Sequence, residues 1–161
     1  MEAKELMIRD WAQSTDLKRP AQYSGRSFDF QPLDGEKYRR LEFLYEDVNC
    51  GMHIPEKRIY PIPLTAEILH KNGFKLSEIP DEYYNDFEPS RFWEYSTDTK
   101  ESLNINIKID ENVNTSIDAH NGDGVQMLQY FTDRNILYVH ELQHALRLVD
   151  LDEMADNLKV E

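Results

Sequence analysis

The sequence is poor in cysteine and in long apolar runs, and each shortage excludes a class of protein. Cys50 is the single cysteine among 161 residues. One cysteine forms no internal disulfide and builds no thiolate-rich metal site. A transmembrane helix needs about 20 consecutive apolar residues, and no run in this chain approaches that length. The opening MEAKELMIRDW lacks the regions of a signal peptide. We therefore expect a reduced protein of the cytoplasm.

Basic residues are scarce in the second half of the chain. The sequence has 31 Asp+Glu against 18 Lys+Arg, a formal net charge of −13. Residues 1–75 hold 12 of each sign, whereas residues 76–161 hold 19 acidic and 6 basic side chains. A protein that binds nucleic acid directly normally shows a basic face. The charge therefore predicts no direct nucleic-acid binding and favours a basic protein partner, with solubility as the alternative reason for the carboxylates.

Two stretches have clear local patterns. LNINIKID at 103–110 alternates strictly between apolar and polar residues, which predicts a half-buried antiparallel strand. LTAEILHKNGF at 64–74 predicts a helix of about two turns. Thr65 is its expected N-cap, and Gly73 lies where a glycine commonly follows a helix end.

The first 63 residues predict shorter elements. ELMIRDWAQ at 5–13 suits a short helix or a strand, and 19–35 is rich in loop residues, with an alternating SFDF at 27–30. YRRLEFLYEDV at 38–48 is a strand candidate. The three prolines of PEKRIYPIP at 55–63 favour extended backbone.

The C-terminal region predicts the longest helix. A helical period runs from Thr132 or Asp133 to about Val149, and a short helix is expected over 152–158. We therefore predict an α+β fold. It has a small N-terminal β-rich or irregular part with a short helix, a central antiparallel sheet, and a long C-terminal helix packed on that sheet. The expected division is 1–63 and an acidic α+β part over 64–161, together forming one compact unit.

The most suggestive motif is HELQH at 140–144. It matches H-E-x-x-H, in which two histidines one helical turn apart bind zinc and the glutamate activates a water molecule. In that interpretation His140 and His144 are the metal ligands and Glu141 is the catalytic base. On a helix these histidines lie roughly opposite the apolar stripe, whose members are Tyr138, Val139, Leu142, Leu146 and Val149.

A third zinc ligand is hard to find in the sequence. The metzincin pattern continues with a glycine and a further histidine, but those positions are Arg147 and Asp150. Glu153 comes too early for a glutamate on a later helix. An upstream third ligand, such as His53, His70 or His120, stays open, although these histidines match no known zinc pattern. We therefore expect no metal and no catalytic residue, with a zinc metallohydrolase as the alternative.

An acidic and aromatic stretch over 81–95 is the candidate partner-binding segment. Aromatic side chains supply binding energy at protein interfaces, and charges supply specificity and steering. Core or cross-strand packing is the alternative role for these rings. The candidate contact residues are Asp81, Glu82, Tyr83, Tyr84, Asp86, Phe87, Glu88, Phe92, Trp93 and Glu94.

Three segments resemble a family of small uncharacterised proteins of Bacteroidetes phages, prophages and mobile elements. AKELMIRDWAQ is similar to the family's ELRIGNWV opening, PIPLTAEILHKNGF to its PIPLTEEILLKNGF segment, and YVHELQHALRLVDLDEMADNLKV to its YVHQLQHALRLCGLNELADNFKV ending. The segments cover roughly a third of the chain, in the same order. This sequence departs from the pattern at Arg9-Asp10, where the family has Gly-Asn. Family endings also carry Gln or Asp at the position of Glu141, and Asn at that of His144, which argues against zinc catalysis.

Three classes of function remain open. The first is a non-catalytic phage or mobile-element accessory protein in the cytoplasm of a bacterial host. It would bind a basic host or defence protein, and could be an anti-defence inhibitor of the anti-CRISPR kind that offers an acidic surface to a nucleic-acid-binding groove. The second is the zinc metallohydrolase. The third is a structural or assembly protein.

Overall fold

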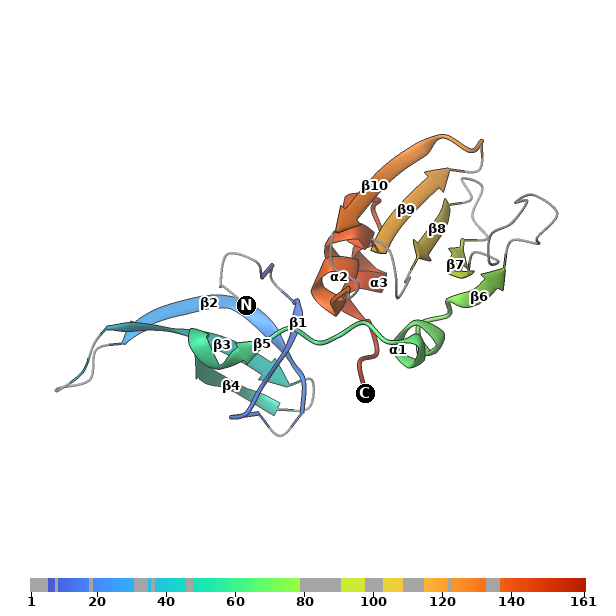
Figure 1. Cartoon of the computed structure of the whole chain (residues 1–161). Coiled ribbons are helices and arrows are strands. Elements are labelled where there is room, and N and C mark those ends of the chain that lie inside the picture. Colours follow the sequence, from blue (N-terminus) through green and yellow to red (C-terminus); the bar gives the residue numbers. More distant parts are fainter. Residues whose placement is uncertain are drawn as a thin grey trace. The chain divides into compact units, whose positions relative to one another are not determined.

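The structure is a computed structural model of the chain (Figure 1). It describes residues 6–7, 9–17, 19–30, 35, 37–45, 48–78, 91–97, 103–108, 115–121, 123–132 and 137–161. Contacts divide the chain into two compact units. The first unit is Met1–Ile62, Tyr138–His144 and Val160–Glu161, and the second is Pro63–Leu137 and Ala145–Lys159. No helix among the described residues is long and apolar enough to cross a membrane.

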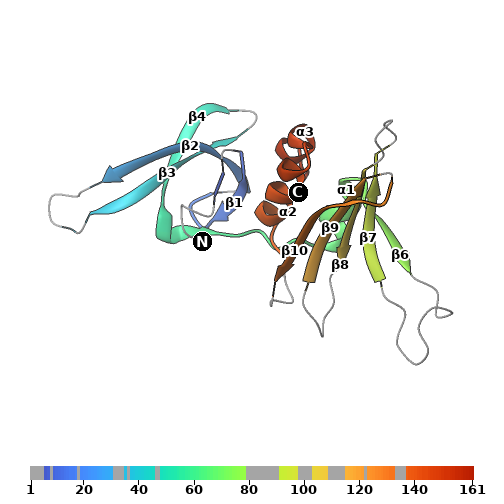
Figure 2. The same cartoon turned by 90° about the horizontal axis from the view of Figure 1, so that it is seen from above.

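The first unit is built on a five-stranded antiparallel sheet with the order β4-β3-β2-β1-β5. Figure 2 labels β1, β2, β3 and β4 of this sheet. Its elements are β1 (Trp11–Ser14), β2 (Ala21–Phe30), β3 (Tyr38–Tyr45), β4 (Val48–Pro55), the 3-10 helix η2 (Glu56–Arg58) and β5 (Ile59–Tyr60). Because small folds host many unrelated functions, the strand order alone indicates none.

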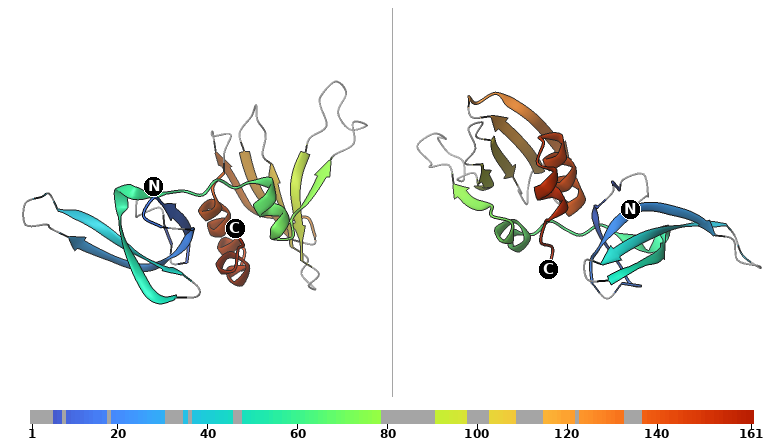
Figure 3. Two further views of the ribbon diagram at one scale, coloured as in Figure 1. Left: turned by 90° about the horizontal axis from the view of Figure 1, so that it is seen from below. Right: turned by 180° about the vertical axis from the view of Figure 1, so that it is seen from behind.

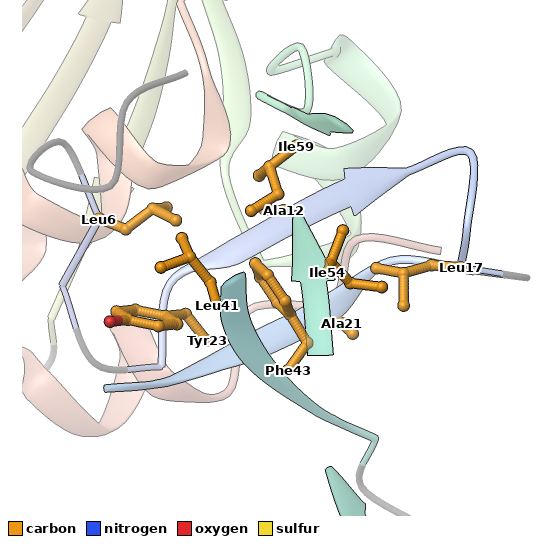
Figure 4. Close-up of a cluster of buried hydrophobic side chains, with 9 residues drawn as sticks. All are labelled: Leu6, Ala12, Leu17, Ala21, Tyr23, Leu41, Phe43, Ile54 and Ile59. Atoms are coloured by element: carbon orange, nitrogen blue, oxygen red, sulfur yellow. The ribbon is translucent and has the colours of Figure 1, made fainter. Parts of the chain in front are cut away.

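A buried apolar cluster lies inside this unit. Figure 4 shows side chains from several strands converging on one another. On β3, Leu41 and Phe43 point inward while Glu42 between them lies on the other face, as the two-residue period of a strand requires. The strand β2 changes register between Tyr23 and Ser27, where Gly25 has a positive φ of 83°. The cluster comprises Leu6, Ala12, Leu17, Ala21, Tyr23, Leu41, Phe43, Ile54 and Ile59.

The second unit contains an antiparallel meander with the order β10-β9-β8-β7-β6. Its strands are β6 (Lys75–Glu78), β7 (Arg91–Ser96), β8 (Leu103–Lys108), β9 (Thr115–Asn121) and β10 (Gln126–Thr132). Ile105 and Ile107 on β8 and Ile117 on β9 are buried. The strand predicted from LNINIKID is therefore confirmed over Leu103–Lys108.

Short helices cover one face of this sheet (Figure 3). These helices are α1 (Ala66–Lys71) and α3 (Asp152–Asp156). A third helix, α2 (Val139–Leu148), has residues in both units. The helix predicted from LTAEILHKNGF is confirmed. The Thr65 hydroxyl accepts a hydrogen bond from the backbone N–H of Ile68 at 3.3 Å, and Gly73 has a φ of 86°. The short helix predicted over 152–158 is also present as α3.

The predicted fold class is wrong. Over the residues that the structure describes, the chain is mostly β, with two five-stranded sheets and short helices, and no long C-terminal helix is among them. Thr132 ends strand β10, which pairs with β9, and α2 begins only at Val139. Asp133 lies outside the described residues. The helical apolar period is present over 139–148, but pairing with β9 determined the conformation of Thr132, where the predicted helix began.

A second correction concerns 19–35. The prolines, glycines and serines there predicted mainly loop, yet β2 covers Ala21–Phe30. Gly25 is accommodated at the register shift, so the strand passes through a residue that normally weakens one. The stretch 38–48 is confirmed as a strand over Tyr38–Tyr45.

Candidate functional site

The glutamate of HELQH fixes the start of α2. One carboxylate oxygen of Glu141 accepts a hydrogen bond from the backbone N–H of Tyr138 at 2.8 Å. The first N–H groups of a helix have no partner within the helix, and a glutamate three residues into it commonly satisfies one of them. The carboxylate that would activate a zinc-bound water is therefore engaged in capping its own helix.

The glutamine of the motif joins α2 to the start of β1. Gln143 is 0% exposed. Its Oε1 accepts from the backbone N–H of Trp11 at 2.9 Å, and its Nε2 donates to the carbonyl of Arg9 at 3.1 Å. A buried amide must satisfy both its donor and its acceptor. Gln143 does so by bonding the backbone on each side of Asp10.

The second histidine contacts a buried carboxylate. Nε2 of His144 lies 2.6 Å from Oδ2 of Asp10. The Asp10 side chain is 0% exposed, and that of His144 is 29% exposed. An ionised carboxylate only accepts hydrogen bonds, so the imidazole donates through Nε2. The same Asp10 oxygen also accepts from the backbone N–H of Met7 at 2.8 Å.

The loop that carries Asp10 is held by backbone hydrogen bonds. Arg9 N–H donates to the carbonyl of Tyr23 at 2.7 Å, and Tyr23 N–H donates to the carbonyl of Asp10 at 2.9 Å. Arg9 has a φ of 68°, which is rarely adopted by residues other than glycine. The surrounding contacts therefore maintain a backbone conformation that Arg9 would not choose alone.

The ring of His140, the first histidine of HELQH, packs against two other rings. His140 is buried, its ring stacks against Tyr138 at 5.9 Å and 12°, and the ring of His144 meets it edge-on at 5.7 Å and 76°. The two imidazoles thus lie close together, as the spacing predicts. In the part of the chain that the structure describes, no group of three or more His, Cys, Asp and Glu side chains could hold a metal ion.

The three upstream histidines belong to other elements. His53 is on β4, where its ring packs on Phe28 at 4.8 Å, while His70 is on α1 and His120 on β9. The signal that sequence reasoning missed is Asp10. It is an isolated carboxylate between a basic residue and an aromatic one, and only the tertiary structure places it beside His144.

Zinc content tests the roles of these side chains directly. If Glu141 and His144 serve as cap and carboxylate partner, protein purified without a His-tag should contain well under one zinc per chain. Glu141→Gln should lower the free energy of unfolding by about 1 kcal/mol because capping is weakened. Metal analysis by mass spectrometry and a denaturation curve measure the two effects. One zinc per chain, lost on His140→Ala, would contradict these assignments.

The candidate partner-binding stretch is only partly described. Asp81, Glu82, Tyr83, Tyr84, Asp86, Phe87 and Glu88 lie outside the described residues. Phe92, Trp93 and Glu94 belong to β7 and are half-buried. Trp93 pairs with Ile107, on the core side of the sheet, and alternation places Phe92 and Glu94 on the opposite side. The three residues therefore do not form one surface.

A separate cluster lies on the outer face of the first sheet. Glu42 on β3 accepts a 2.7 Å hydrogen bond from the hydroxyl of Ser24, with His53 at 3.5 Å and Arg26 at 3.8 Å. The Ser24 hydrogen bond is the largest influence on Glu42 and lowers its pKa. Burial opposes this shift, while Arg26 and His53 add to it.

The lowered pKa of Glu42 makes part of the stability pH-dependent. The folded state holds Glu42 charged more strongly than the unfolded state, whose pKa is near 4.5. This contribution is therefore complete above that value and is lost as the pH falls through the lower folded pKa. Glu42→Gln should flatten the pH dependence of the melting temperature below pH about 4.5. A melting profile no flatter than that of the wild type would contradict this.

Comparison with other proteins returned no relative. No family model, curated protein or solved structure matches the chain. The function of this chain must therefore be inferred from its own charges and contacts, together with the resemblance of its three short segments.

Proposed function

We propose that this protein is a non-catalytic binding protein whose second unit presents carboxylates to a basic partner protein. The charge distribution carries the proposal. The second unit has 18 Asp+Glu against 8 Lys+Arg, a balance of −10, and the first unit has 13 against 10. Unpaired surface charge of one sign steers oppositely charged partners and repels others.

Exposed carboxylates gather near the start of α3. Asp150, Asp152 and Glu153 are all exposed, and the nearby Asp156 is bonded to Arg147 at 3.1 Å. Asp150 lies two residues after the end of α2 and has a positive φ of 60°. These side chains are available to a partner without rearrangement of the helix.

The contacts of HELQH support a non-catalytic role. Glu141 caps its helix, Gln143 bonds the backbone on both sides of Asp10, and His144 bonds Asp10 itself. Each of these groups has a structural purpose that needs no substrate. A motif that stabilises the fold requires no catalytic explanation.

The segment resemblance suggests where the partner is found. Proteins of phages and mobile elements act inside a bacterial host, so the proposed partner is a host or defence protein. A nucleic-acid-binding groove is lined with Lys and Arg to hold phosphate, and a carboxylate-rich surface is complementary to it. We therefore propose inhibition of such an effector as the biological role.

Affinity capture from a bacterial lysate at low and high salt tests this proposal. The immobilised chain should retain a basic, nucleic-acid-binding protein at low salt, and added DNA or RNA should compete for that protein. Raising the salt should weaken the capture because exposed charges are screened beyond a Debye length of about 10 Å at 0.1 M.

Charge variants make the test specific. Asp152→Asn with Glu153→Gln should lower the association rate with the captured protein severalfold. Asp29→Asn in the first unit, whose side chain is 84% exposed, is the matched control and should leave the rate unchanged. Retention of no basic protein, or capture that is indifferent to salt, would refute the proposal.

A further inference from the structure

Strand β10 is an edge strand of the second sheet. The order β10-β9-β8-β7-β6 places it at one end, paired with β9 alone among the described strands. Figure 1 shows it at the margin of the meander. An edge strand offers unpaired N–H and C=O groups to another strand, and proteins usually protect such edges with charge, proline or short length.

The two edges of this sheet differ in protection. At the opposite edge, β6 has four residues and begins and ends with charged side chains, Lys75 and Glu78. β10 has seven residues with no charge and no proline. The stretch 124–132 is the longest in the whole sequence without Asp, Glu, Lys or Arg. In a chain where 30% of residues are charged, an uncharged edge of this length is conspicuous.

Exposed apolar side chains accompany this edge. Val125 is 59% exposed and Met127 is 54% exposed, both in or beside the first residues of β10. Gln126 and Gln129 are also exposed. The edge therefore presents apolar and amide groups, which can be buried against another strand without the cost of desolvating a charge.

The net charge of the chain indicates which molecule would pair with the edge strand β10. A basic protein is attracted by the carboxylates of the second unit and gains nothing from an uncharged strand. Two copies of this chain repel each other over most of their surfaces, since each carries −13. They can approach most closely where charge is absent. A two-fold axis brings the same surface of both copies together, so one uncharged strand suffices for both.

We propose that β10 pairs antiparallel with β10 of a second copy, which makes one continuous sheet across two chains. Gln129 is the middle residue of the seven, so pairing centred on it aligns the full length of both strands. The two Gln129 side chains then lie directly opposite one another. Met127 becomes covered in each copy. This inference does not depend on the proposed function.

Light scattering coupled to size-exclusion chromatography tests the pairing on the full chain. Over a concentration series, the mass should rise to twice that of one chain. Added salt should strengthen the dimer because it screens the repulsion between the two acidic copies. Gln129→Lys should weaken the dimer about tenfold or more, because like charges directly opposite on paired strands repel.

Leu76→Lys is the matched control for that variant. Leu76 is 52% exposed on β6, the other edge of the same sheet. The same charge placed there should leave the dimer intact. A monomer at every concentration, or a dimer weakened by Leu76→Lys and not by Gln129→Lys, would overturn the proposal.

A cysteine variant locates the contact independently of stability. In a Cys50→Ser background, Gln129→Cys should form a disulfide between two chains on mild oxidation, because directly opposite residues have Cβ atoms about 4.5–5.5 Å apart. Asp123→Cys, outside the strand, should not. Equal crosslinking at both positions would also overturn the pairing.

Discussion

Replacing His144 by alanine should lower the free energy of unfolding by about 3 kcal/mol. The substitution leaves the buried Asp10 carboxylate without the imidazole that lies 2.6 Å from it. Removing a hydrogen-bond donor from a buried carboxylate leaves that carboxylate less well compensated in a poorly solvated place. The imidazole is itself partly exposed, so we expect the lower end of the range for such pairs. Urea denaturation measures the change.

A double-mutant cycle separates the pair from general packing. In an Asp10→Asn background, the position has no buried charge to compensate, so His144→Ala should cost only about 1 kcal/mol. His144→Gln, which keeps an amide donor, should also cost less than alanine in the native background. If His144→Ala costs the same in both backgrounds, the contact contributes nothing specific and our assignment is wrong.

Replacing Gln143 by glutamate should cost about 3 kcal/mol or more at neutral pH. The two side chains have the same shape, but a carboxylate cannot donate to the carbonyl of Arg9 and would place a charge at a site that is 0% exposed. Burial raises the pKa of such a carboxyl. Chemical denaturation at pH 7 measures the effect.

The cost of Gln143→Glu should shrink in acid. A protonated carboxyl donates one hydrogen bond and accepts another, as the native amide does. Because the folded-state pKa is raised above the unfolded value of about 4.3, the penalty is full above the raised pKa and fades as the pH falls towards 4. Gln143→Met has no titrating group and should keep the same cost at every pH. Parallel pH profiles for the two variants would contradict this explanation.

Local patterns in the sequence correctly predicted the helices and strands whose conformation depends mainly on residues close together in the sequence. Thr65 and Gly73 mark the ends of α1, and the strict alternation at 103–108 matches β8. The predicted C-terminal helix was extended too far upstream, to Thr132, where pairing with Thr115 of β9 decides the conformation. An extended helix was therefore predicted where a strand ends.

The candidate site was predictable only in part. Sequence spacing placed His140 and His144 on one side of a helix, and the structure brings their rings together. It could not reveal Asp10, because that contact joins residues 134 positions apart. Arg9 occupies a backbone conformation that suits glycine, and Asp10 bonds His144.

The hydrogen bonds that Gln143 and His144 make around Asp10 have a consequence for folding during synthesis on the ribosome. All five strands of the first unit are complete by Tyr60, yet the side chains that bond Trp11 and Asp10 are made near the end of translation. A nascent chain therefore holds Asp10 without its imidazole partner while about 80 further residues emerge, which takes several seconds at about 5–20 residues per second. Contacts so distant in sequence also slow folding. Folding of the first unit should thus be completed only after the C-terminal residues have been made. A truncated chain ending at residue 62 should be readily cleaved by proteases.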